Sequence, residues 1–174
     1  MQDVTSPTQS TERLRAYASA ALTPFFASAA NGCETAARNT AEGLLNDYRA
    51  ATPKEIQLSA QIIASGLATL ACLSAASVAK HDSINEMLRL QREALKLHRT
   101  SDKATKMLEA RKKQRTTNPK TMTAAHTKWD EGTFQRSINQ ALDKFNDSNA
   151  RVAAYMESLR TNTGKPKPDA SISK

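Results

Sequence analysis

Positively charged side chains are concentrated between Lys96 and Lys120, where the chain has nine lysines and arginines against two acidic residues. On a helix most of them share one stripe. Cations spaced one turn apart can neutralise successive phosphates, so this surface could contact an anion or nucleic acid. The solvated outer face of a bundle helix has the same composition, and we favour that interpretation. The basic surface consists of Arg92, Lys96, Arg99, Lys103, Lys106, Arg111, Lys112, Lys113, Arg115 and Lys120.

The formal net charge of +8 makes acidic proteins, nucleic acid and anionic surfaces plausible partners. No aromatic residue is interleaved with the basic residues of this surface, and no recognition-helix pair, zinc finger or RNA-binding motif is present. Any nucleic-acid contact would therefore use the phosphate backbone and would not read the base sequence.

Catalytic and metal-binding patterns are weak. His81, His98 and His126 lie far apart, and no His-x-x-x-His, Glu-x-x-His or Cys-x-x-Cys spacing occurs. Cys33 and Cys72 lie among small apolar residues on predicted helices. We expect both to be buried free thiols in a reducing compartment. We predict no catalytic residues, no metal, no cofactor and a cytoplasmic location.

Small and heptad-spaced apolar residues form a second pattern. Alanines recur every three or four positions on the central predicted helix, and large apolar residues keep the same spacing on the last one. A ridge of small residues could lie inside the bundle or at a subunit interface, and we favour the inside. The predicted packing or self-association seam is Ala60, Ala64, Ala68, Ala71, Ala75, Phe134, Ile138, Phe145, Val152, Tyr155 and Leu159.

The central helix, residues 53–80, organises these elements. Thr52, Pro53 and Glu55 supply a cap, a first-position proline and a capping-box glutamate. No charged residue occurs from Ile56 to Ala79, so the helix should be covered nearly all round. Its many serines and threonines argue against a membrane span.

Capping signals and periodicity predict helices over residues 11–22, 24–50, 53–80, 84–115 and 134–160 of one domain, residues 10–160. A flexible arm, 1–9, precedes this domain and a disordered tail, 161–174, follows it. Asn31-Gly32 could break or kink the second helix. Short turns between long helices favour antiparallel neighbours. We expect an all-α fold: an antiparallel bundle of about four long helices with an extra short N-terminal helix.

The helix over 84–115 has a second apolar row in its first half. Ile84, Leu88, Gln91 and Leu95 lie beside the main heptad seam. We expect this half to be buried on two sides.

These patterns favour a non-enzymatic structural or protein-interaction module that self-associates through its apolar seams, as a homo-oligomer. The alternative is a basic helical protein that binds nucleic acid independently of sequence. Salt separates the two, because phosphate binding weakens by orders of magnitude between about 50 and 200 mM salt.

Overall fold

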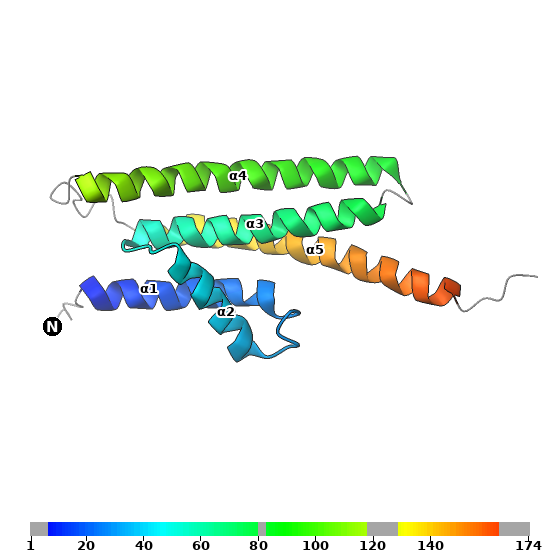
Figure 1. The fold of residues 1–174 in the computed structure, drawn as a ribbon, viewed down its shortest axis with the longest axis horizontal. Helices are drawn as coiled ribbons and strands as arrows, with labels where there is room; N and C mark the ends of the chain where they lie inside the picture. Colours follow the sequence, from blue (N-terminus) through cyan, green and yellow to red (C-terminus); the bar gives the residue numbers. More distant parts are fainter. Residues whose placement is uncertain (1–6, 80–82, 118–128, 164–174) are drawn as a thin grey trace, which may run out of the picture.

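The computed structural model describes residues 7–79, 83–117 and 129–163, which are all-α. Successive helices run in opposite directions, and the predicted all-α antiparallel bundle is confirmed (Figure 1). The third helix packs along both the fourth and the fifth, and the first two lie near its first half. The elements are α1 (Pro7–Leu22), the 3-10 helix η1 (Thr23–Phe26), α2 (Glu34–Asp47), α3 (Pro53–Ala79), α4 (Ile84–Thr117) and α5 (Glu131–Thr163).

The predicted capping box starts α3. The backbone N–H of Glu55 donates to Thr52 Oγ1 over 3.3 Å, and Glu55 Oε2 accepts the backbone N–H of Thr52 over 3.3 Å. Pro53 takes the first helical position, where its missing N–H has no partner to lose. The described part of the helix extends to Ala79, and residue 80 of the predicted helix lies outside the described residues.

The core is built where the alanines of α3 meet large side chains of α5. Ala60, Ala64 and Ala68 are buried in one cluster with Phe134 and Ile138. Small side chains on α3 let the two backbones approach closely. Burying a side chain such as Phe134 contributes about 1.5–3 kcal/mol to folding.

The cover over α3 is complete only in its first half. Every residue from Glu55 to Ala60 is buried, as predicted. Further along, Leu70 is 65% exposed and Leu73 is 47% exposed, so the expectation of a helix covered nearly all round is wrong there. The last turn of α2 lies nearest α3, and from there α2 slopes away from α3, so it does not cover this face (Figure 1).

The predicted helix over residues 24–50 is broken in two. Asn31 and Gly32 have left-handed backbone conformations, with φ of 50° and 77°. A residue in this region ends a right-handed helix, and glycine adopts it without steric cost. The N–H of Gly32 donates to the carbonyl oxygen of Ala27 over 2.9 Å and closes the turn before α2.

The other helices extend beyond their predicted bounds. Pro7 starts α1 inside the predicted arm, Thr117 ends α4, and α5 reaches Thr163 inside the predicted tail. The rest of the arm, 1–6, and of the tail, 164–174, lie outside the described residues.

The start of α5 differs from the prediction in its cap. The backbone N–H of Thr133 donates to Asp130 Oδ1 over 3.0 Å, so Asp130 rather than Thr133 caps this helix. Hydrogen bonding by the backbone and side chain of Thr133 lowers the pKa of Asp130. Trp129 packs beside the cap, with its ring centroid 4.7 Å from that of Phe134 and 6.0 Å from that of Tyr17.

Among the described residues, α3 is the one helix long and apolar enough to cross a membrane, judged by length and composition alone. Half of its most apolar window is buried inside the bundle. A core helix of a soluble protein has these same properties, so this is weak evidence, and the absence of a membrane span stays a prediction.

Candidate interaction surface

The predicted basic surface lies along α4, and the structure divides it into two kinds of residue. Arg92, Lys96, Arg99, Lys103, Lys106 and Lys113 are exposed. Arg111, Lys112 and Arg115 are half-buried, and Lys120 lies outside the described residues. Lys96 Nζ forms an ion pair with Glu93 over 3.1 Å. The structure thus leaves a stripe of exposed cations on the outer face of α4.

Arg115 has a structural role instead. Its Nη1 donates to Glu55 Oε2 over 2.7 Å, and Glu55 is fully buried at the start of α3. The same oxygen accepts the backbone N–H of Ala51 over 2.7 Å, whereas Oε1 has no hydrogen-bond partner. Glu55 therefore caps α3 and holds the end of α4, and its charge is balanced mainly by Arg115.

Gln57 joins α3 to the start of α5. Its Nε2 donates to the backbone oxygen of Asp130 over 3.3 Å, and its Oε1 accepts Lys54 Nζ over 2.8 Å. Burial, followed by the nearby charge of Arg111, lowers the pKa of Lys54. This end of the bundle is fixed by buried polar contacts.

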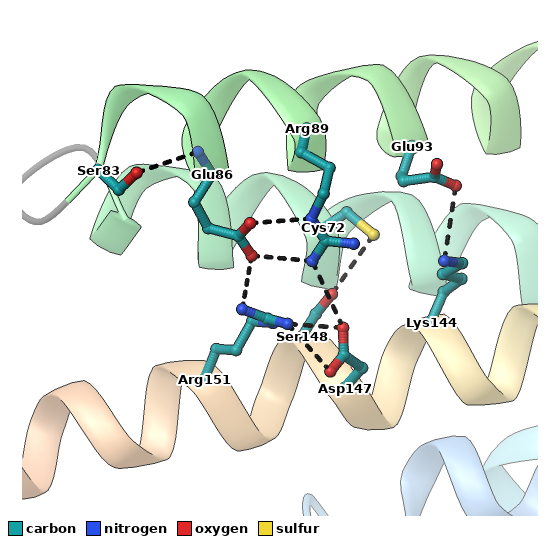
Figure 2. Close-up of polar contacts among 9 residues, drawn as sticks. All are labelled: Cys72, Ser83, Glu86, Arg89, Glu93, Lys144, Asp147, Ser148 and Arg151. Atoms are coloured by element: carbon teal, nitrogen blue, oxygen red, sulfur yellow. Dashed lines mark hydrogen bonds and ion pairs between the residues drawn. The ribbon is translucent and has the colours of Figure 1, made fainter.

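The other end is held by an exposed ionic network between α4 and α5 (Figure 2). Glu86 accepts hydrogen bonds from Arg89 over 2.8 and 2.9 Å and from Arg151 over 2.5 Å, and Asp147 pairs with Arg151 over 3.2 Å. The Arg89 hydrogen bond, with the charge of Arg151, lowers the pKa of Glu86. The Ser83 hydroxyl caps α4 by accepting the N–H of Glu86 over 3.4 Å. This network aligns α4 with α5.

A second contact in the same region joins Glu93 of α4 to Lys144 of α5 over 3.7 Å (Figure 2). The hydrogen bond from Lys96 lowers the pKa of Glu93, and Lys144 adds to the shift. Both carboxylates are thus held ionised by cations.

Most residues of the predicted seam are buried or half-buried inside the bundle. Its alanines on α3, together with Phe134 and Ile138, are buried, and Phe145, Val152 and Tyr155 are half-buried. Leu159, near the end of α5, is exposed. These residues therefore pack the bundle, and little of the seam is left to bind a second copy.

The second apolar row of α4 is exposed, which corrects the expectation that this half is buried on two sides. Ile84 is 68% exposed, Leu88 40% and Leu95 48%, and Gln91 is exposed as well. The row points away from α3, and no described element lies against it. We call Ile84, Leu88 and Leu95 the outer row.

An apolar groove lies between α2, α3 and α4. Its volume is about 420 Å³. Its lining includes Leu44 of α2 with Tyr48 directly after that helix, Leu67 and Leu70 of α3, and His98 of α4. The groove lies beside the part of α3 that α2 leaves uncovered, and Leu73 follows Leu70 one turn further along.

Sequence reasoning missed the groove. Leu70 and Leu73 lie on the side of α3 that turns away from the alanine ridge, which was a usable signal. Whether that side is covered depended on the direction in which α2 leaves α3, which the spacing of apolar residues does not show (Figure 1).

Residues with catalytic potential are not brought together in the part of the chain that is described. His98 is exposed and pairs with Asp102 over 3.6 Å, whereas His81 and His126 lie outside the described residues. Over those same residues, no three His, Cys, Asp or Glu side chains gather to hold a metal. Cys33 is exposed before α2, contrary to expectation, and Cys72 is buried beside Ser148 Oγ at 3.4 Å.

Comparisons of the chain with protein-family models, curated proteins and solved structures find no match. The candidate function therefore depends on the surfaces described above.

Proposed function

We propose that this protein is a non-enzymatic helical interaction module that self-associates through the apolar surface formed by the groove and the outer row. One observation carries the proposal: five large apolar side chains on α3 and α4, Leu70, Leu73, Ile84, Leu88 and Leu95, are at least 40% exposed. Exposed apolar patches of this kind on soluble proteins mark interaction sites. A second copy would cover the face of α3 that α2 leaves exposed.

Light scattering at several protein concentrations tests this proposal. The mass of the wild type should rise with concentration, and the double variant Leu70→Ser with Leu73→Ser should stay at the mass of one chain. The control is Met156→Ser with Leu159→Ser, which removes two similarly exposed apolar side chains from α5. A wild type that remains monomeric at every concentration would contradict the proposal.

The second candidate function is sequence-independent binding of nucleic acid. It is favoured by the exposed cations of α4, of which Arg92, Arg99, Lys103 and Lys106 form no ion pair with another described residue. A gel-shift titration should then show retardation that falls steeply between about 50 and 200 mM salt. Apolar self-association should barely change over the same range, and absence of retardation at low salt removes this candidate.

A further inference from the structure

The turn that joins η1 to α2 contains the one Asn-Gly step of the chain, Asn31-Gly32. Both residues are exposed, and the side chain of Asn31 forms no hydrogen bond with another described residue. A Cβ atom placed on Gly32 would meet nothing within 4 Å. The Asn31 amide can therefore rotate, and the space around the backbone nitrogen of Gly32 is open.

This arrangement permits a reaction within the chain. The backbone nitrogen of Gly32, once it has lost its proton, can attack the side-chain carbon Cγ of Asn31. A succinimide ring forms, the bond from Cγ to Nδ2 breaks, and ammonia leaves. Water then opens the ring: breaking the bond from nitrogen to Cγ gives aspartate, and breaking the bond from nitrogen to the main-chain carbonyl carbon gives isoaspartate. One water is consumed for each ammonia released, and nothing is oxidised or reduced.

The backbone of the turn should slow this reaction only modestly. The N–H of Gly32 donates to the carbonyl oxygen of Ala27 over 2.9 Å, and this hydrogen bond must open before the nitrogen can attack. An exposed hydrogen bond of this kind contributes little net free energy, so the reaction should be slower than in the unfolded chain by no more than about tenfold. Asn31 has a φ of 50°, which is unfavourable for a residue with a Cβ atom, so leaving this conformation relieves strain.

The other asparagines lack this combination. Each of them is followed by a residue with a side chain, which hinders approach to the next backbone nitrogen. Asn46 and Asn139 also lie inside α2 and α5, where backbone N–H groups donate along the helix. Their side-chain oxygens accept hydrogen bonds from Arg15 and Gln135. Asn31 is therefore the asparagine most open to this reaction.

We propose that Asn31 is a site of spontaneous deamidation, and that its isoaspartate product loosens α2. Isoaspartate lengthens the main chain of the turn, because the chain then runs through the side-chain carbon. The turn joins two buried side chains, Phe25 of η1 and Ala37 of α2, which are 3% and 0% exposed. A longer turn cannot keep both in their places without distortion.

Peptide mass spectrometry of the folded, full-length protein tests the site. The protein is stored at mildly alkaline pH, which favours loss of the proton from the attacking nitrogen. The peptide that contains Asn31 should gain the mass difference between an amide and an acid before any other asparagine-containing peptide does. Gly32→Ala should lose most of this conversion, because a Cβ then shields the nitrogen. Gly43→Ala, inside α2, is the control and should convert like the wild type.

The chain unfolded in urea supplies the reference rate, and the folded protein should convert within about tenfold of it. An Asn31 that stays intact in the folded protein while the unfolded chain converts would show that the turn protects it, and the proposal would be wrong. Earlier conversion at another asparagine, or equal conversion in Gly32→Ala, would overturn it as well. None of these measurements depends on whether copies of the chain associate.

Urea denaturation of the stored protein tests the loosening of α2. The isoaspartate form, separated by chromatography, should unfold at a lower urea concentration than the fresh protein. Asn31→Asp reproduces the other product with a main chain of normal length, and it should unfold like the wild type. An isoaspartate form as stable as the fresh protein would overturn this part of the proposal.

Discussion

The two halves of α3 have similar sequences and different surroundings. From Ile56 to Ala79 the helix has no charged residue, yet every residue from Ile56 to Ala60 is buried, whereas Leu70 and Leu73 further along are open to solvent. The difference lies in the neighbouring helix, because α2 slopes away from α3 and leaves the second half open on this side (Figure 1). The sequence of an uncharged helix indicates that it should be buried, but other parts of the chain decide how much of it a neighbour buries.

The largest difference between the halves should appear on truncating one large side chain in each. Ile56→Ala removes a fully buried side chain and should lower the free energy of unfolding by about 3–4 kcal/mol. Leu73→Ala in the open half should change it by less than about 0.5 kcal/mol in the dilute protein. Urea denaturation measures both. Equal losses would show that the second half is covered.

Breaking the ion pair between Glu55 and Arg115 at the start of α3 should give the next largest loss of stability. Arg115→Met leaves the buried Glu55 carboxylate without its cation and should lower the free energy of unfolding by about 3 kcal/mol. This value is at the lower end of the range for breaking a buried ion pair, because the Arg115 side chain is 31% exposed. Adding Glu55→Gln should recover part of this loss. A double-mutant cycle by urea denaturation measures the coupling, and additive losses would contradict it.

The turn that limits α2 should show a smaller effect. A Cβ at position 32 would meet nothing within 4 Å, so Gly32→Ala should be unfavourable only through its φ of 77°. We expect a loss of about 1 kcal/mol in thermal or urea unfolding. Gly43→Ala, inside α2 and equally free of contacts, is the matched control and should be neutral or stabilising.

The smallest effect should come from the exposed network between α4 and α5. The pKa of Glu86 lies below its ordinary value of 4.5, so its pairing stabilises the fold above that pH and is lost as the pH falls through the lowered pKa. Glu86→Gln should cost under about 1 kcal/mol at pH 7 and nothing at pH 2. Urea denaturation at both values, repeated in high salt, measures this. An effect that persists at pH 2 would show that packing, not charge, is responsible.

Much of the fold could be predicted from the sequence. The capping box at Thr52 and Glu55 marked the start of α3, and the spacing from Phe134 onward identified the buried face of α5. The break at Gly32 was noticed but its consequence was not, because helical periodicity continues across Asn31 in the sequence while the backbone turns away.

The candidate surface was only half predictable. The exposed cations of α4 followed from their spacing, but Arg115 did not, because its partner Glu55 lies 60 residues away. The row from Ile84 to Leu95 was predicted to be buried, since periodicity shows which residues share a face and does not show whether anything lies against it.

The two thiols give the molecule a built-in reporter. Cys33 is open to solvent before α2, whereas Cys72 is enclosed between α3 and α5 next to Ser148. An alkylating reagent should modify the first at once and reach the second only when α5 separates from α3. The slow phase of labelling thus times the opening of the bundle, with no added probe.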